Sequence, residues 1–286
     1  MTAVAGTGSP TARRRELGSI LRTLRTDNSL TVEQAAEQLL VSPSKISRLE
    51  NGQRGASARD IRDLCNLYGV DDETRQLLTD LAAEGKQRAW WQSLSLPYST
   101  YVGLEADAVS IRDFALGIVP GLLQTTDYAR AIVHAANPRR GAEELEVLVR
   151  ARRERQDRVL GTEPPTFSAI MDEAVLHRVV GGPAVMEEQL RWLRDASLRP
   201  NMSIRIVPYA AGALPTGNNK FIILSFDRPS LTDVVYIESL TGELILERES
   251  DLEVYNDAYR TLSDMAASAE DSRGMMTRLL EHGYAR

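Results

Sequence analysis

The chain has 286 residues, of which 43% are hydrophobic and 26% charged, and its formal net charge at pH 7 is −6. This composition is ordinary for a soluble globular protein, and the length suffices for one small and one larger domain. No run of apolar residues approaches the ~18 that a membrane-spanning helix needs, which excludes a membrane-spanning protein.

The charge is unevenly distributed along the chain. Ten Lys and Arg against six Asp and Glu give residues 1–62 a net charge of +4, while the other residues hold 24 against 34, a net charge of −10. A basic N-terminal part beside an acidic remainder indicates that only the N-terminal part approaches a polyanion. Chance variation in a solvated surface is the alternative interpretation.

We predict a disordered tail over residues 1–12 and a five-helix domain over residues 13–85. In the first helix, four apolar residues recur at the spacing that places them on one helix face. These residues are Leu17, Ile20, Leu21 and Leu24.

The second and third helices carry clear start and stop signals. Thr31 followed by Gln34 predicts a capping box, in which each side chain satisfies the other residue's backbone N–H. Ser42 followed by Pro43 predicts the start of the third helix, and Asn51-Gly52 predicts its end in a left-handed conformation. Two short helices separated by about three residues form a helix-turn-helix, whose second helix fits the major groove of DNA.

Two further helices complete the predicted domain. The fourth starts near Ser57, with Asp60 as its capping partner, and buries an apolar stripe on one face. The fifth runs from about Asp72. The stripe residues of these two helices are Ile61, Leu64, Cys65, Tyr68, Leu77, Leu78 and Leu81.

The outward positions of the third helix carry short hydroxyls and long cations, Ser44, Lys45, Ser47 and Arg48. Base edges and phosphates accept hydrogen bonds from such groups, so this face predicts contact with double-stranded DNA. A helix-turn-helix kept only for protein docking is the alternative.

The run "LTVEQAAEQLLVSPSKISRLENGQR" resembles the Xre/Cro/repressor class of DNA-binding domains, over about residues 16–70. The resemblance implies that Ser42 also faces the DNA and that Asn51 and Arg54 contact its backbone. It further implies that Arg25 and Glu50 form an ion pair between the first helix and the end of the third; two unrelated surface charges are the alternative. Leu40 departs from the family, which usually has Gly in this turn, so the turn is either not left-handed or strained.

We predict a linker over residues 86–104 and an α+β domain over residues 105–286, which makes the whole chain mainly α. Helices are expected over 106–116, 127–136, 143–160, 173–180, 183–198, 249–269 and 271–282. Five segments rich in β-branched and aromatic residues predict strands, and "LTG" predicts a hairpin between the last two. We expect a small, mostly antiparallel sheet with helices on one face. The strand segments are "TFSAIMD", "SIRIVP", "KFIILSF", "DVVYIES" and "ELILE".

The second domain resembles the C-terminal domain of actinobacterial Xre-type regulators, including WhiJ-like developmental regulators, a group also described as antitoxin-like. The most specific part of this resemblance is "GIVPGLLQTTDYARA", followed by "RRERQDR", "MDEAVLHRVVGG", "VMEEQL" and "VVYIESLTGELILE". The resemblance implies a regulator whose second domain binds a small protein encoded by an adjacent gene. It carries over no catalytic residue.

The sequence gives no catalytic, metal-binding or cofactor-binding pattern. His134, His177 and His282 lie far apart and lack a Cys or His at metal-ligand spacing. The segment "GALPTGNNK" has the glycine spacing of a phosphate loop, but Asn218 stands where the required Lys would be. Cys65 is the only cysteine, so no internal disulfide can form, which fits a reducing cytosol and a cytoplasmic protein.

These observations predict a sequence-specific DNA-binding transcriptional regulator that acts as a homodimer, because one recognition helix reads few bases. Its second domain would bind a small protein partner or a small-molecule effector. An antitoxin that neutralises a small cognate protein and represses its own operon is the alternative. An enzyme with a fused autoregulatory DNA-binding domain is a third hypothesis, and we expect no enzymatic activity.

Overall fold

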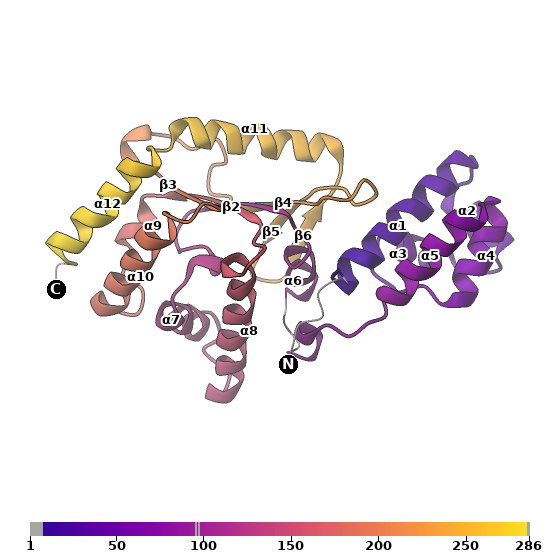
Figure 1. Ribbon diagram of the computed structural model, residues 1–286, viewed down its shortest axis with the longest axis horizontal. Helices are drawn as coiled ribbons and strands as arrows, with labels where there is room; N and C mark the ends of the chain where they lie inside the picture. The colour runs from indigo at the N-terminus through magenta and orange to yellow at the C-terminus, as the bar shows by residue number, and fades with distance from the viewer. Residues whose placement is uncertain (1–7, 95, 97, 285–286) are drawn as a thin grey trace. The chain divides into compact units, whose positions relative to one another are not determined.

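The computed structural model describes residues 8–94, 96 and 98–284, and its chain divides into two compact units (Figure 1). Unit 1 comprises Met1–Ser95, Ser99–Asp107 and Phe226–Thr232. Unit 2 comprises Leu96–Tyr98, Ala108–Ser225 and Asp233–Arg286. Unit 1 therefore extends beyond the predicted domain over residues 13–85, since it also includes two segments from later in the chain.

Unit 1 begins with a bundle of helices whose caps follow the sequence signals. Thr31 and Gln34 form the predicted capping box, as do Ser57 and Asp60. The side chain of Ser42 accepts a hydrogen bond from the backbone N–H of Lys45. The helices are α1 (Pro10–Asp27), α2 (Val32–Gln38), α3 (Pro43–Glu50), α4 (Ala58–Tyr68) and α5 (Asp72–Glu84).

The predicted disordered tail is wrong where the structure can test it. Residues 1–7 of that prediction lie outside the described residues, but α1 already begins at Pro10. Ser9 caps it by accepting a hydrogen bond from the N–H of Thr11, and both residues are buried. Ser9-Pro10 is the same helix-start signal as Ser42-Pro43 at α3, and here it directly follows a run of small residues.

The bundle is held by one apolar core. Leu17 and Leu21 of α1 meet Ile46 and Leu49 of α3, and all four side chains are 1–2% exposed. Leu77, expected in the stripe of α5, is instead 46% exposed, while its neighbour Leu78 is fully buried. The core thus fixes the end of α3 against α1, which leaves the opposite side of α3 uncovered within this unit.

The predicted linker over residues 86–104 contains regular structure. A short 3₁₀ helix, η1 (Trp90–Leu94), is followed by α6 (Ser99–Glu105). Trp91 is 5% exposed and Trp90 39% exposed, and their rings meet edge to face with centroids 5.7 Å apart. Both of these elements belong to unit 1, whereas Leu96–Tyr98 between them belongs to unit 2.

Charged side chains form a second cluster in unit 1, around the buried residues Arg13 and Glu16. Arg13 pairs with Glu16 at 2.8 Å and with Glu84 at 2.5 Å. Arg228, from the Phe226–Thr232 segment, lies 3.4 Å from Glu16 and 3.8 Å from Asp107. A segment from the second half of the sequence therefore contributes a cation to the N-terminal unit.

Six strands of the described chain form one mixed sheet in unit 2, in the order β3-β2-β1-β4-β5-β6. Neighbouring strands are parallel for β1-β2 and β2-β3 and antiparallel for the other three pairs. The mainly α fold class with an α+β second domain is confirmed. The strands are β1 (Ser110–Ala115), β2 (Thr166–Asp172), β3 (Met202–Val207), β4 (Phe221–Ser225), β5 (Val234–Glu238) and β6 (Glu243–Leu246).

The helix predicted over residues 106–116 is wrong, because these residues include the central strand β1. Ser110 pairs with Thr166 on one side and with Ser225 on the other. Two neighbouring strands satisfy the backbone of β1, and this pairing overrides the weak local helix propensity. The five predicted strands correspond to β2–β6, and their bounds are confirmed within one or two residues.

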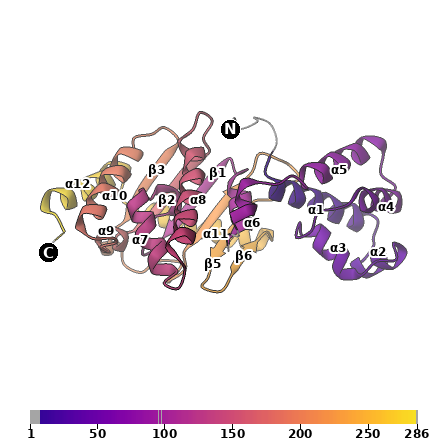
Figure 2. The same ribbon diagram turned by 90° about the horizontal axis from the view of Figure 1, so that it is seen from below.

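The expectation of helices on one face of the sheet is also wrong. Within unit 2, α11 (Glu249–Met265) covers one face, and α7 (Thr126–Ala136) and α8 (Ala142–Leu160) lie on the other (Figures 1 and 2). Parallel strands buried on both faces need such cover, and Phe167, Ala169, Ile170 and Met171 of β2 are all buried. The remaining helical elements of unit 2 are η2 (Gly121–Leu123), α9 (Ala174–His177), α10 (Pro183–Ala196), η3 (Tyr209–Ala211) and α12 (Ala269–His282).

None of the described helices has the length and apolar character required to cross a bilayer.

Candidate nucleic-acid interface

The turn between α2 and α3 is left-handed at Leu40. Its φ is +53°, and its side chain is 93% exposed. The backbone N–H of Leu40 bonds to the carbonyl oxygen of Glu37, and the N–H of Val41 to that of Ala36. Of the two readings that the sequence allowed, the structure has the left-handed turn. A side chain with a Cβ costs roughly 1–2 kcal/mol in this conformation.

Replacing Leu40 by Gly is therefore expected to stabilise unit 1 by about 1 kcal/mol, after subtraction of the extra chain entropy that Gly loses on folding. The Leu40→Ala variant is the control, because it removes the exposed side chain but keeps the strained Cβ. Urea unfolding followed by circular dichroism measures both. Equal unfolding free energies for the Gly and Ala variants would contradict the assignment of strain to the backbone.

The predicted DNA-contacting residues lie on and just after α3. Ser42, Ser44, Arg48 and Arg54 are exposed, whereas Lys45, Ser47 and Asn51 are half-buried. Arg48 donates Nε to the carbonyl oxygen of Ser44, one turn earlier in its own helix, at 3.1 Å. Two hydroxyls and two guanidinium groups are thus available on the surface of unit 1.

Lys45 is held differently from the other predicted contacts. Its Nζ lies 2.5 Å from Oδ1 of Asp60 on α4, and the two side chains are 23% and 10% exposed. Burial by itself would raise the pKa of the Asp60 carboxyl, but hydrogen bonds from Lys45 and Ser57 outweigh it and hold that pKa below its ordinary value. A phosphate contact by Lys45 would have to share this ammonium group with Asp60.

This pair predicts a pH dependence of stability. The pKa of Asp60 is lowered in the folded state, so its ionised carboxylate contributes to the free energy of unfolding. This contribution is complete above about pH 4, near the unfolded pKa, and is lost as the pH falls through the folded pKa. Lys45→Met is expected to raise the pKa of Asp60, as measured by NMR titration of its carboxyl carbon. It should also shift the acid loss of stability to higher pH. An unchanged titration curve would show that Lys45 does not set this pKa.

Arg22 of α1 was not among the predicted site residues. One of its Nη groups donates to the side-chain oxygen of Asn51, whose side-chain nitrogen donates to Oγ of Ser47 at 3.3 Å. Arg22 is exposed and precedes Arg25 by one helical turn. That spacing was the available signal, since it places both arginines on the face of α1 that meets the end of α3.

Arg25 and Glu50 form a two-pronged ion pair between α1 and α3. Nε of Arg25 lies 2.6 Å from Oε1 of Glu50, and Nη2 lies 2.9 Å from Oε2. The remaining Nη1 donates to the carbonyl oxygen of Leu30 at 2.8 Å. The hydrogen bonds from Arg25 to Glu50 raise the pKa of this guanidinium above its ordinary value. The side chains are only 11% and 4% exposed, so the pair fixes the end of α3 from inside the unit.

Backbone packing positions the same end of α3. A Cβ at Gly18 of α1 would lie 2.4 Å from the carbonyl oxygen of Glu50 and 2.6 Å from that of Leu49. Only a residue without a side chain lets α1 approach α3 this closely.

Two family models match the chain. A helix-turn-helix domain matches residues 16–78, and a domain of unknown function (DUF5753) matches residues 98–278. Among solved structures, the chain is similar to that of the clp gene regulator ClgR from C. glutamicum, with 28% identity and a TM-score of 0.22. That match covers 27% of this chain and 96% of the other. No curated protein was found to match. The chain therefore belongs to the family of proteins that carry this domain of unknown function, with a helix-turn-helix domain preceding it.

Proposed function

We propose that this protein is a sequence-specific DNA-binding transcriptional regulator of the Xre type, with α3 as its recognition helix. The observation that carries the proposal is the position of α3. Its inner side is anchored by Ile46, Leu49 and the Arg25–Glu50 pair, and its outer side presents Ser44 and Arg48. A rigidly held helix with exposed donors is what direct readout of base edges requires.

We propose that the regulator acts as a homodimer. A single recognition helix contacts few base pairs, so selective binding requires two half-sites about 34–36 Å apart on one face of the DNA. Residues 105–286 hold 21 Lys and Arg against 28 Asp and Glu, and this net charge of −7 fits a second domain that stays away from phosphates.

The second domain, in this proposal, binds rather than catalyses. The resemblance to WhiJ-like actinobacterial regulators favours a small protein encoded by an adjacent gene as its partner, with a small-molecule effector as the alternative ligand. Coupling between the two domains would change operator affinity by a factor that corresponds to about 1–3 kcal/mol. A partner that leaves operator affinity unchanged would contradict a regulatory role for this domain.

The antitoxin hypothesis shares the DNA-binding domain and differs in the role of the partner. It requires the adjacent gene product to inhibit growth when expressed alone and to be neutralised when this chain is co-expressed. If cells that express the adjacent gene product alone grow normally, the antitoxin hypothesis is excluded and the regulator hypothesis is retained.

Two variants test the DNA contacts on an operator selected from random DNA. Arg48→Ala is expected to relax preference at one base position by about 1–3 kcal/mol, because its exposed guanidinium would read a base edge. Arg54→Ala should weaken binding to all sequences alike and reduce the salt slope by about one unit. Arg191→Ala, an exposed arginine of α10 in unit 2, removes the same charge and serves as the control. If Arg48→Ala and Arg54→Ala both bind DNA as the Arg191→Ala control does, α3 is not the recognition helix.

A further inference from the structure

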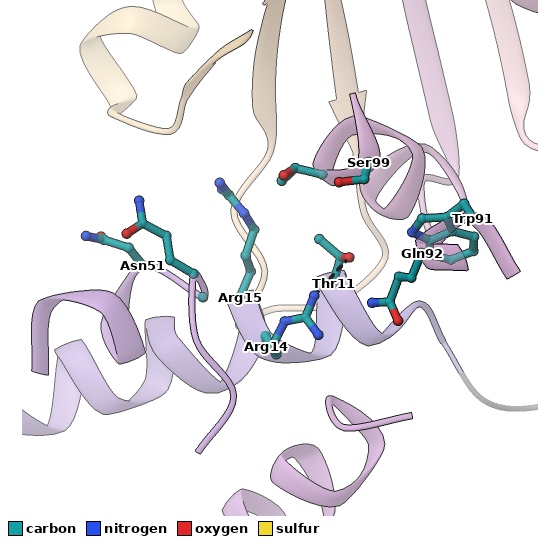
Figure 3. Close-up of a pocket in the computed structure, with 10 residues that line it drawn as sticks. Thr11, Arg14, Arg15, Asn51, Trp91, Gln92 and Ser99 are labelled. Carbon is teal, nitrogen blue, oxygen red and sulfur yellow. Dashed lines mark hydrogen bonds between the residues drawn. The ribbon is translucent and has the colours of Figure 1, made fainter. Parts of the chain in front are cut away.

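Unit 1 contains a small pocket beside the end of α3 (Figure 3). Its volume is about 130 Å³, and ten residues from four segments line it. These segments are the first turns of α1, the loop after α3, η1 and the start of α6. A cavity of this size accommodates a phosphate or a short carboxylate, since a cavity of ~150 Å³ holds a benzene molecule.

The indole of Trp91 places an unpaired hydrogen-bond donor in this pocket. The residue is 5% exposed, yet its Nε1 has no hydrogen-bond partner among the described residues. Figure 3 shows the ring nitrogen on the side of the indole that faces Thr11 across the pocket. Leaving a buried N–H donor unpaired is unfavourable, so a hydrogen-bond acceptor in the pocket would satisfy it.

The other polar groups of the pocket are also donors suited to an anion. Arg14 donates from Nη1 to the carbonyl oxygen of Gly85 at 2.9 Å and from Nη2 to Oγ1 of Thr11 at 3.3 Å, which fixes its guanidinium in place. Burial lowers the pKa of Arg14, and a bound negative charge would offset that cost. Ser99 and Thr100 add hydroxyls, and none of the ten lining residues is Asp or Glu.

We propose that this pocket binds a small oxyanion, a phosphate or carboxylate group, through the Nε1 of Trp91 and the guanidinium of Arg14. Preorganised N–H donors and a positive charge in a site without acids select negatively charged oxygen over neutral or cationic ligands.

The pocket also touches the segment that ends α3. Asn51, Gly52 and Gln53 line it, and the carbonyl oxygen of Arg48 accepts hydrogen bonds from the backbone N–H groups of both Gln53 and Arg54. Gly52 has a φ of +65°, and a Cβ there would lie 2.7 Å from Cγ of Arg15. A ligand in the pocket therefore contacts the loop that connects Arg48 to Arg54, and we expect its binding to change the position of both arginines. This effect on DNA binding rests on the proposed DNA-binding function.

The first test is an NMR titration of the full chain with inorganic phosphate, with acetate as the carboxylate probe and chloride as the ionic-strength control. The chain has three tryptophans, so three indole N–H signals report separately. The indole N–H signals of Trp91 and Trp90 are assigned by their loss in the Trp91→Phe and Trp90→Phe variants. We expect a saturable shift of the Trp91 signal and none of the Trp90 signal. No saturable shift with either anion, or equal shifts of both signals, would overturn the proposal. The titration itself is carried out on the parent chain, and the variants serve only to assign the signals.

The second test uses Trp91→Phe, which keeps the ring and removes the donor. Calorimetry should show about tenfold weaker phosphate binding, the loss expected for one hydrogen bond to a charged group. Trp90→Phe, with a 39% exposed indole outside the pocket, should bind phosphate as the parent does. Equal affinity of the two variants would remove Trp91 from the site.

The third test identifies the source of the oxyanion. Fluorescence anisotropy measures operator binding at constant ionic strength, with phosphate replacing chloride. Competition between phosphate and DNA would assign the pocket to a DNA backbone phosphate, whereas simultaneous binding with altered affinity would assign it to a free ligand. A chain that binds phosphate at Trp91 but no DNA would refute the proposed function and leave the anion site standing.

Discussion

Replacing Glu50 by Gln is expected to lower the free energy of unfolding of unit 1 by about 3 kcal/mol, because it leaves the guanidinium of Arg25 buried without its counter-charge. Both oxygens of Glu50 accept from Arg25, and the carboxylate side chain is 4% exposed. Solvent therefore offers little compensation. Urea unfolding of the full chain, monitored by circular dichroism, measures the loss.

Two controls separate the ion pair from general effects of charge. Glu37→Gln removes an exposed carboxylate of α2 and should change stability by less than about 0.5 kcal/mol. Exchanging both Arg25 and Glu50 for Met should recover most of the loss, since a buried ion pair is often replaceable by apolar residues of similar volume. A Glu50→Gln variant as stable as the Glu37→Gln variant would show that the pair contributes nothing to the position of α3.

Replacing Gly18 by Ala is expected to lower the free energy of unfolding by about 1–3 kcal/mol, the usual cost of inserting a methyl group where there is no room. The new Cβ would lie 2.4 Å and 2.6 Å from two carbonyl oxygens at the end of α3. Since backbone atoms cannot rotate away, α1 and α3 must separate. Operator affinity should fall together with stability, because the separation moves Arg48 and Asn51.

Gly274 provides a matched control for this variant. It also lies inside a helix, α12, but a Cβ there would meet only the end of the Arg278 side chain, at 3.4 Å. Gly274→Ala is expected to stabilise the chain by about 0.5–1 kcal/mol, through the better helix propensity of Ala. If Gly18→Ala also stabilises the chain, the close approach of α1 and α3 is not a constraint.

Sequence reasoning succeeded at most of the helix starts that a local signal marks. Thr31 with Gln34, Ser57 with Asp60 and Ser42 with Pro43 each mark a helix start that depends on residues within one turn. The strands β2 to β6 are short runs of β-branched and aromatic residues bounded by turns, and their positions follow from that pattern.

Apart from the start of α1 at Ser9-Pro10, the failures concern structure that depends on distant partners. The segment around Ile111 and Phe114 contains apolar residues at a spacing that fits a helix, and only pairing with Thr166 and Ser225 on its two sides makes it a strand. The placement of helices on both faces of the sheet has the same origin. Nothing near α11 in the sequence indicates which face it will cover.

For the candidate interface, the sequence indicated which residues lie on α3 but not what they contact. The pairing of Lys45 with Asp60 joins two helices, and so does the contact of Arg22 with Asn51. Spacing within one helix indicates at most the face on which a residue lies, as for Arg22, and not the residue that it contacts. The assignment of individual side chains to bases and phosphates stays a prediction until the variants are measured.

The contribution of Arg228 to unit 1 bears on any exchange of DNA-binding domains between relatives of this protein. A chimera cut after residue 107 would take Glu16 and Asp107 but leave behind the guanidinium that lies 3.4 Å and 3.8 Å from them. The transplanted piece would then carry two partly buried carboxylates with one neighbouring cation fewer. Functional chimeras should therefore require grafting of residues 226–232 together with the N-terminal helices.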